Sequence, residues 1–505
     1  MKYDVIIGME IHAQLKTKSK MFCNTSNNGE NMAPNTAICE VCTGQPGTLP
    51  VINMQAIEWT VLTGLALDCQ IAEQTKFDRK NYFYPDLPKG YQISQYDQPI
   101  SFDGFLEINE QKIKVIRIHL EEDTGKLLHP ENTNYSLVDY NRAGTPLMEL
   151  VTAPDIKSAE TAKKFCQEYQ KILRYLDVSD ANMEKGQMRC EANISLQEKG
   201  AWERKGDEIV PKKGCKLNAK IELKNINSFK AMERAVNYEI KRQTKVLDEG
   251  GELLQETRGW NDASGKTYHQ RIKESAHDYR YFPEPDLPPL DLKETKEKIK
   301  KDLPELPQEK VKRFVEEYGF IKTNAELIAE NKDLANYVEK VISELKAWLV
   351  SLPEVEGSND EIFEQNKKKI AKLVSNWLIN KLGGLMRNGD DLKSKITPEN
   401  FAEFLTLIHQ NKINATSGMK ILEIMFNKGE DPSQILEEGD FDQIEDNSVL
   451  DKAIKKAIAD NPKAVEEYKG GKLNAIQFLV GQVMKETKGK AQPQTVKGIL
   501  EDKLK

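Results

Sequence analysis

The residues from Val5 to Leu15 combine a strand pattern with side chains that can bind a cation. Apolar residues occupy every second position, and Glu10, His12 and Gln14 lie among the residues between them. Alternation with a period of two over this length predicts a β-strand. Because side chains two positions apart on a strand lie about 6.5–7 Å apart on one face, one metal ion or phosphate group can contact both Glu10 and His12. The alternative is an ordinary strand whose polar face meets solvent.

Later segments repeat the alternation and place charged or amide side chains on one face. The polar residues at alternating positions are Arg117, His119, Glu121 and Asp123; Arg189, Glu191, Asn193 and Ser195; and Lys220, Glu222 and Lys224. A further segment passes through Arg142 and Gly144 into the apolar run that contains Glu149. An antiparallel sheet with one face on helices and one face open alternates in this way. The mixture of acidic, imidazole and basic groups indicates a charged cleft that binds a metal and phosphates.

Composition sets limits on the rest of the molecule. A chain of 505 residues, 39% hydrophobic and 30% charged, is typical of a soluble protein with several domains. No run approaches 18 apolar residues, so we expect no membrane partner. Seven scattered cysteines argue against a disulfide framework and for the reducing cytoplasm. With a net charge of −7, any nucleic-acid binding requires a local basic patch.

The chain changes character near residue 292. Before this point it is rich in strands and loops, with helices predicted at 158–176 and 229–248, the second capped by Ser228. The proline-rich segment 282–289 marks the seam, and a Lys/Glu-rich helical pattern follows it. We therefore predict an α+β protein: an antiparallel-sheet catalytic domain with flanking helices (1–292), an all-helical middle domain (293–410) and a small helical tail domain (411–505).

Two loops carry further candidate chemistry. Cys23, Cys39 and Cys42 resemble a zinc knuckle, but three sulfurs are one short of a closed structural site, and Thr25 stands where a fourth cysteine would complete it. Zinc binding and metal-free cysteines are both open. The segment 76–91 interleaves cations with aromatic residues, which is typical of a loop that stacks on bases and contacts phosphates and also of ordinary interfaces.

Longer motifs point to one family. They are the segments 7–12, 76–84, 91–99, 120–126, 141–147, 222–228 and 278–286, together with 478–485 and 488–490 near the end. In type and order these motifs closely resemble the B subunit (GatB) of the heterotrimeric tRNA-dependent amidotransferase, which makes Gln-tRNA or Asn-tRNA from misacylated precursors. The resemblance extends over essentially the whole chain.

The resemblance implies an ATP-dependent enzyme. The side-chain carboxylate of Glu or Asp on tRNA is phosphorylated and then amidated with ammonia from the partner A subunit, while a small C subunit holds the A and B subunits together. The implied catalytic and Mg²⁺-binding residues are Glu10, His12, Glu122 and Glu149. Since histidine is an unusual Mg²⁺ ligand, His12 would act through water or favour Mn²⁺. Strict alternation puts Glu122 on the side away from Glu121, so Glu122 needs a β-bulge to reach the metal, and without one Glu121 is the better ligand.

Further residues are implied to bind ATP or the aminoacyl end. The candidates for phosphate contacts are Lys80, Arg142, Arg189, Lys224 and Arg280, and those for orienting the ligands are Tyr82, Tyr84, Asn193, Asn225 and Asn227, with Glu191 nearby. The helical middle would cradle the acceptor stem of tRNA, and the basic tail would contact its outer body through shape and phosphates. A competing hypothesis is a non-catalytic tRNA-binding scaffold subunit. A weaker one is a stand-alone ATP-dependent ligase.

Overall fold

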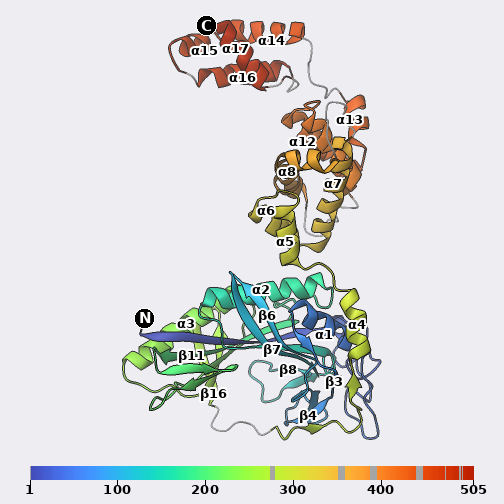
Figure 1. Ribbon diagram of the computed structural model, residues 1–505, viewed down its shortest axis with the longest axis vertical. Helices are drawn as coiled ribbons and strands as arrows, with labels where there is room; N and C mark the ends of the chain where they lie inside the picture. Colours follow the sequence, from blue (N-terminus) through green and yellow to red (C-terminus); the bar gives the residue numbers. More distant parts are fainter. Residues whose placement is uncertain are drawn as a thin grey trace. The chain divides into compact units, whose positions relative to one another are not determined.

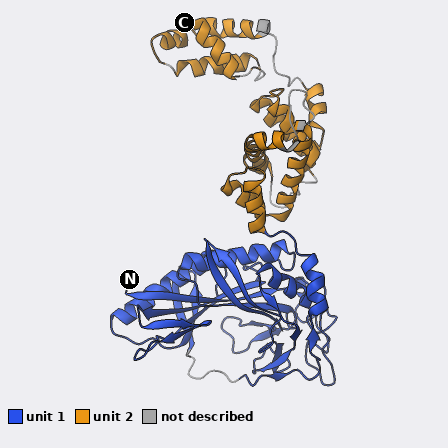
Figure 2. Cartoon of the chain, in the orientation of Figure 1, with its two compact units in different colours: residues 1–306 blue, residues 307–505 orange. Residues whose placement is uncertain are grey.

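The chain folds into two compact units, Met1–Leu306 and Pro307–Lys505 (Figure 2). The computed structural model describes residues 2–272, 279–350, 359–386, 395–439, 447–472, 474–487, 491 and 493–504. Among the described residues, none of the helices combines the length and the apolar character that crossing a membrane requires.

A nine-stranded sheet forms the centre of the first unit (Figure 1). Its strand order is β16-β15-β14-β11-β1-β10-β7-β6-β2, and all neighbours are antiparallel except β14 and β15. The strands are β1 (Tyr3–Gln14), β2 (Gln70–Ile71), β6 (Ser101–Ile108), β7 (Gln111–Glu122), β10 (Pro146–Thr152), β11 (Met188–Glu198), β14 (Ile221–Lys224), β15 (Glu256–Asn261) and β16 (Lys266–Ile272). The opening strand thus lies in the middle of the sheet, between β10 and β11.

Helices cover the apolar face of this sheet (Figure 1). They are α1 (Met54–Ala66), α2 (Ala159–Tyr175), α3 (Phe229–Asp248) and α4 (Lys293–Lys301). The hydroxyl groups of Ser158 and Ser228 accept hydrogen bonds from backbone N–H groups in the first turns of α2 and α3, as N-cap residues do. Both long helices therefore begin and end close to the predicted positions.

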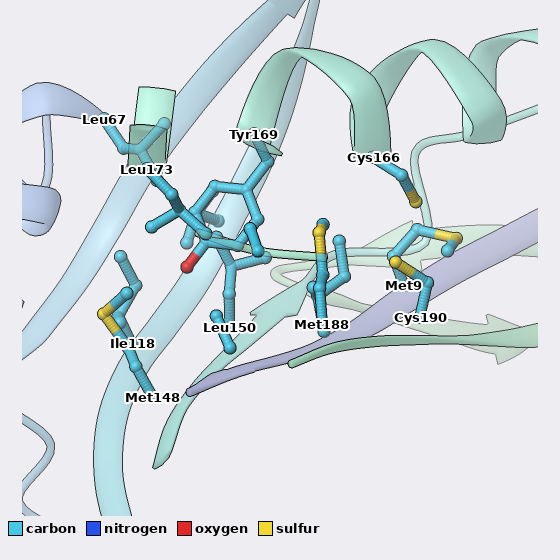
Figure 3. Close-up of a cluster of buried hydrophobic side chains, with 14 of the residues drawn as sticks. Met9, Leu67, Ile118, Met148, Leu150, Cys166, Tyr169, Leu173, Met188 and Cys190 are labelled. Carbon is cyan, nitrogen blue, oxygen red and sulfur yellow. The ribbon is translucent and has the colours of Figure 1, made fainter. Parts of the chain in front are cut away.

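The core between the helices and the sheet is fully buried. Figure 3 shows Tyr169 and Leu173 of α2 beside Leu150 of β10 and Ile118 of β7, all with essentially no exposed surface. Each fully buried aliphatic side chain of this kind stabilises the fold by about 1.5–3 kcal/mol. With one face of β1, β7 and β10 fixed against the helices in this way, alternation directs their polar residues to the opposite face.

Smaller sheets complete the first unit. The three-stranded sheet β17-β4-β5 comprises β4 (Asp78–Asn81), β5 (Tyr91–Ser94) and β17 (Phe282–Pro283), and it joins two segments that lie about 200 positions apart in the sequence. The remaining elements are β3 (Gln74–Thr75) paired with β18 (Leu290–Asp291), β8 (Lys126–Leu128) with β9 (Leu137–Asp139), β12 (Trp202–Lys205) with β13 (Glu208–Pro211), and the 3-10 turn η1 (Gly29–Asn31).

Among the described residues of the second unit, all regular secondary structure is helical. Its helices are α5 (Pro307–Glu316), α6 (Lys322–Ala329), α7 (Lys332–Val350), α8 (Asn359–Ser375) with its π-helical continuation η2 (Asn376–Leu382), α9 (Gly383–Leu385), α11 (Pro398–His409), α12 (Ala415–Lys428), α13 (Pro432–Glu438), α14 (Asn447–Asp460), α15 (Pro462–Lys469), α16 (Ala475–Glu486) and α17 (Pro493–Leu504). They contribute to two hydrophobic clusters, one from Phe314 to Ile435 and one from Leu450 to Leu504.

The predicted α+β architecture is confirmed. The hydrophobic cores, however, do not end at residues 292 and 410, where the sequence pattern changes. Ile299 of α4 belongs to the core of the first unit, which therefore extends past residue 292 to Leu306. Ile413 and Ile435 pack into the same cluster as α7 and α11, so no core boundary lies at residue 410. The functional assignment of the three predicted segments stays a prediction.

Candidate metal and phosphate site

One row of paired residues crosses the centre of the main sheet on its polar face. His119 of β7 lies opposite Glu149 of β10, Glu149 opposite His12 of β1, and His12 opposite Arg189 of β11. Directly opposed residues of antiparallel strands point to the same face with their Cβ atoms about 5 Å apart. The fold thus brings two imidazoles, a carboxylate and a guanidinium from four strands into one line.

Carboxylates surround the imidazole of His12. Its Nε2 atom lies 3.3 Å from Glu149 Oε2, 3.6 Å from Glu121 Oε1 and 4.0 Å from Glu10 Oε1. The Nε2 atom of His119 lies 3.4 Å from the same Glu149 oxygen. Glu10, His12 and Glu149 form one group with the spacing of metal ligands, and His119, Glu121 and Glu149 form another that shares Glu149. We refer to these five residues as the acidic cluster.

The electrostatics of the acidic cluster reflect its crowding. Burial raises the pKa of Glu10, and the neighbouring charge of Glu149 raises it further. Burial alone would lower the pKa of His12, but the carboxylates of Glu149 and Glu121 raise it to about 9. The pKa of Glu149 is held well below its usual range, against the effect of burial, by His119 and His12. The cluster therefore favours positive charge at its centre, which a proton on His12 or a divalent cation can supply.

A second acidic group adjoins the first on the side of β11 and β14. Glu191 lies opposite Glu10, and Glu222 shares with them the spacing of metal ligands. Lys224 already neutralises part of this group, since its Nζ atom lies 2.7 Å from Glu191 and 3.5 Å from Glu222. These carboxylates raise the pKa of Lys224 although burial opposes the shift. Lys224 is thus a fixed cation at the edge of the acidic cluster.

Two arginines converge on a single carboxylate at the other edge. The guanidinium of Arg189 donates to Asp123 Oδ1 at 3.1 Å, and Arg142 Nε lies 3.5 Å from Asp123 Oδ2. Gln14 donates to the same Oδ2 atom at 2.9 Å. Although burial acts in the opposite direction, Arg189 and Arg142 lower the pKa of Asp123. Two guanidinium groups held by one carboxylate leave a net positive charge, as an anion-binding site requires.

Lys80 of β4 adds a cation ringed by tyrosines. Its Nζ atom lies 5.2 Å from the ring centre of Tyr279 and 6.0 Å from that of Tyr82. Tyr281 packs edge-on against Tyr279 and stacks at 4.3 Å on Tyr96. Burial would lower the pKa of Lys80, but Glu121, Tyr281 and Glu149 together outweigh burial and raise the pKa. Lys80 therefore stays charged beside the acidic cluster and can meet a phosphate there.

Comparison with known proteins identifies the family of the chain. Residues 5–298 match the GatB/GatE catalytic domain, and residues 361–504 match the GatB domain. The chain belongs to the GatB family. It is 47% identical to the B subunit of the aspartyl/glutamyl-tRNA(Asn/Gln) amidotransferase of Thermoanaerobacter pseudethanolicus, over the whole of both chains. Proteins of the same name are 46% identical in Caldanaerobacter subterraneus, again over both whole chains, and 45% identical in Dehalococcoides mccartyi, over all of this chain and 99% of the relative.

Within this GatB-family fold, one predicted ligand points elsewhere. The carboxylate of Glu122 accepts hydrogen bonds from Lys89 Nζ at 2.6 Å and from the backbone N–H of Ile93 at 2.9 Å. The pairing of β7 with β10 is regular from Glu122–Pro146 to Arg117–Val151. The bulge that Glu122 would need to reach the metal is therefore absent from this described part of the ladder. The expected position of Glu122 beside His12 is therefore corrected, and Glu121 occupies that position.

The other predicted residues divide into two groups. Glu10, His12, Glu149, Glu191, Lys224, Arg189, Arg142, Lys80 and Tyr82 lie in or beside the acidic cluster. Asn193 lies on β11, two positions from Glu191 and opposite Glu222. In contrast, Tyr84 is 61% exposed, Asn225 donates to the hydroxyl of Tyr268, and Asn227 and Arg280 are exposed. Position 278 and residues 488–490 of the family motifs lie outside the described residues.

The sequence assigns no individual role to His119, Asp123, Gln14, Tyr279 and Tyr281, although the first three lie on the predicted polar strand faces. His119 and Asp123 carry a signal that was available, because they alternate with Glu121 on one strand face and so must share its side of the sheet. Tyr279 and Tyr281 reach the site through the pairing of β17 with β4, about 200 positions earlier in the chain. No local pattern reports such a contact.

The three candidate zinc ligands also come together. The sulfur atoms of Cys23, Cys39 and Cys42 lie within 4.8 Å of one another. Cys42 accepts a hydrogen bond from the backbone N–H of Cys39 at 3.1 Å, and the buried ammonium of Lys20 lies 3.6 Å from its sulfur. The hydrogen bond from Cys23, together with this ammonium, lowers the pKa of Cys42 to about 5 against the effect of burial. The group thus supplies three sulfurs and one neighbouring cation.

Proposed function

We propose that this chain is the catalytic B subunit of a cytoplasmic tRNA-dependent amidotransferase. It would use ATP to phosphorylate the side-chain carboxylate of Glu-tRNA(Gln) or Asp-tRNA(Asn) and then convert the phosphorylated group to the amide. The relatives named above carry the name of this enzyme over their full length. The observation that carries the proposal is the convergence of His12, Glu10, Glu121 and Glu149 beside fixed cations at the centre of one sheet.

The acidic cluster fits a divalent cation. Carboxylate oxygens are the ligands that Mg²⁺ prefers, and Glu10, Glu121 and Glu149 supply them within 4.0 Å of one imidazole nitrogen. The Nδ1 atoms of His12 and His119 are buried without a hydrogen-bond partner, so each ring makes its polar contacts through Nε2 on the cluster side. An imidazole in the set suits Mn²⁺ as well, and with Mg²⁺ it would act through water. Bound there, the metal would neutralise charge on the triphosphate.

The cations around the cluster fit the remaining charge of ATP. Arg189 and Arg142 stand on one side, held by Asp123, while Lys224 stands on another side, held by Glu191. Lys80 of β4 lies near enough to Glu121 and Glu149 for their charges to raise its pKa. Attack of a carboxylate on a γ-phosphate joins two anions, so catalysis depends mainly on positioning and charge neutralisation. Fixed cations on several sides of a metal site serve this requirement.

The proposed reaction has two steps, phosphorylation of the carboxylate and amidation of the acyl phosphate. A carboxylate oxygen of the aminoacyl group attacks the γ-phosphorus, the bond from this phosphorus to the bridging oxygen breaks, and ADP leaves with the electron pair. Ammonia then attacks the carbonyl carbon of the acyl phosphate, the bond from this carbon to the phosphate oxygen breaks, and inorganic phosphate leaves with the electron pair and with the proton that the nitrogen loses. The positioned cations Lys80 and Arg189 would stabilise the oxygens that gain charge in the first step. The ammonia would come from glutamine through the partner A subunit, and a C subunit would hold the complex together.

The test uses the chain assembled with its A and C subunits. We expect Glu-tRNA(Gln) or Asp-tRNA(Asn) to stimulate ADP release, and Glu149→Gln to abolish that release while glutamine hydrolysis by the partner largely survives. Assays with each misacylated tRNA in turn would identify the substrate.

The competing scaffold hypothesis predicts the opposite result. A subunit that only presents tRNA to a catalytic partner has no need of the acidic cluster, so ADP release would be unchanged in Glu149→Gln. That outcome would refute the proposal. A stand-alone ligase would instead consume ATP with a free amino acid in the absence of both partners.

A further inference from the structure

A buried ion pair lies directly behind Lys80, on the other face of its strand. Arg79 donates to both carboxylate oxygens of Glu284, from Nε at 2.7 Å and from Nη2 at 2.7 Å. The Glu284 side chain is completely buried, and that of Arg79 is 21% exposed. Because successive residues of a strand point to opposite faces, Arg79 and Lys80 face away from each other across β4. The ion pair therefore does not contact the proposed phosphate site.

The ion pair joins two segments that lie far apart in the sequence. Glu284 follows β17, whose Phe282 pairs directly with Arg79, and the backbone N–H of Glu284 donates to Phe77 at 2.9 Å. The Arg79 guanidinium also lies over the rings of Tyr91 at 4.3 Å and Phe282 at 5.8 Å. A bidentate, buried pair stacked in this way holds its two segments in one relative position.

The segment held by this pair carries the tyrosines that surround Lys80. Asn81 fixes its start, because its backbone N–H donates to the carbonyl of Tyr279 at 2.9 Å and its side chain donates to the carbonyl of Arg280 at 2.7 Å. Tyr279 and Tyr281 then stand on the Lys80 side of the sheet, where Tyr279 lies 5.2 Å from the ammonium. We refer to Tyr279 and Tyr281 as the tyrosine wall. The position of Lys80 thus depends on the tyrosine wall, and the ion pair on the other side of β4 fixes the segment that carries it.

We propose that Glu284, through Arg79, is a positioning residue for Lys80. The pair holds residues 279–284 against β4, so that the wall of Tyr279 and Tyr281 confines the Lys80 ammonium beside the acidic cluster. This inference rests on the proposed function for its effect on ATP use, but its structural part does not. Loss of the Glu284 charge would free the tyrosine wall and let Lys80 turn toward solvent.

The direct test measures the accessibility of Lys80 in the full chain. Reductive methylation followed by peptide mass spectrometry reports how fast each lysine is modified. In Glu284→Gln we expect the rate at Lys80 to rise about threefold or more. The matched control is Glu239→Gln, since Glu239 is also completely buried and also pairs with an arginine, Arg242. This control should leave the rate at Lys80 unchanged.

A second variant removes a different contact of the tyrosine wall, the stacking of Tyr96 on Tyr281. Tyr96 stacks on Tyr281 and is 61% exposed, so Tyr96→Ala removes one support of the wall at little cost to folding. We expect the methylation rate at Lys80 to rise in this variant as well. An unchanged rate at Lys80 in both Glu284→Gln and Tyr96→Ala would overturn the inference.

The kinetic test uses the assembled complex. Glu284→Gln should lower kcat/KM for ATP about tenfold, because a small displacement of a positioned group is costly to catalysis. In a Lys80→Met background the same change should cost less than about twofold, since residues that act together are not additive. An equal loss in both backgrounds would contradict the inference. If the wild-type complex released no ADP, the proposed function would fail, and the methylation rates would still decide the role of Glu284.

Discussion

Glu121 and Glu122 are neighbours in the sequence, but their buried carboxylates point to opposite sides of β7 and have different partners. Glu121 lies 3.6 Å from His12 Nε2 within the acidic cluster. Glu122 binds Lys89 and the backbone of Ile93, and it lines a cavity of about 250 Å³ that also contains Cys42. Since a strand alternates its side chains between two faces, only one of two adjacent glutamates can reach the cluster.

This difference predicts contrasting effects of the same substitution at adjacent positions. Glu121→Gln should weaken Mn²⁺ binding by about tenfold or more and abolish tRNA-stimulated ADP release, because a charged ligand is lost. Glu122→Gln should keep Mn²⁺ binding within about twofold, and lower the melting temperature because the ammonium of Lys89, whose side chain is only 11% exposed, loses its charged partner. Mn²⁺ titration followed by electron paramagnetic resonance would measure the affinity. Normal binding in Glu121→Gln with loss of binding in Glu122→Gln would reverse the assignment.

Much of the fold could be predicted because its signals are local. The period-two pattern of residues 5–15 identifies β1, and serine caps followed by apolar residues at helical spacing identify α2 and α3. The boundary between the compact units could not be predicted from local patterns. Whether α4 belongs to the first core or to the helices after it depends on where Ile299 packs, which is a tertiary contact.

The site could be predicted in part for the same reason. Alternation correctly places Glu10 and His12 on one face of β1, and it indicates that Glu122 points away from Glu121. It cannot state which strands are neighbours, so the row from His119 through Glu149 to His12 became visible only with the strand order. Motif resemblance named Glu122 without this geometric information.

Asp123 offers a test of how the proposed phosphate-binding arginines are held. Asp123→Asn removes the charge that orients Arg189 and Arg142 while keeping the shape of the side chain. We expect the KM for ATP to rise about tenfold in the assembled complex, because the two guanidinium groups repel each other once the carboxylate is neutral. The control is Asp155→Asn, which removes a carboxylate paired with Arg204 on the same unit. Equal effects of both changes would argue against a role for Asp123 in ATP binding.

The stability of the first unit should depend on pH through Glu256. Although burial acts in the opposite direction, hydrogen bonds from His269 and Arg258 lower the pKa of Glu256 below its unfolded value of 4.5. A lowered pKa in the folded state contributes stability above pH 4.5, and this contribution is lost as the pH falls from there through the folded-state pKa. The melting temperature of Glu256→Gln should therefore lie below that of the wild type at pH 7, and the difference should shrink as the pH falls below 4.5. A constant difference across this range would contradict the prediction.

The cysteine group predicts a gain of zinc affinity. The side chain of Thr25 is hydrogen-bonded to Cys23, so a cysteine at position 25 would bring a fourth sulfur to the three that already lie within 4.8 Å of one another. A fourth thiolate completes the tetrahedral set of a structural site, so Thr25→Cys should bind Zn²⁺ about tenfold or more tightly than the wild type. Competition with a chromophoric chelator would measure both affinities. Thr25→Ser is the matched control, because it keeps a hydroxyl group and adds no sulfur. If Thr25→Cys and Thr25→Ser bound zinc equally, the three sulfurs would not be arranged to accept a fourth ligand from position 25.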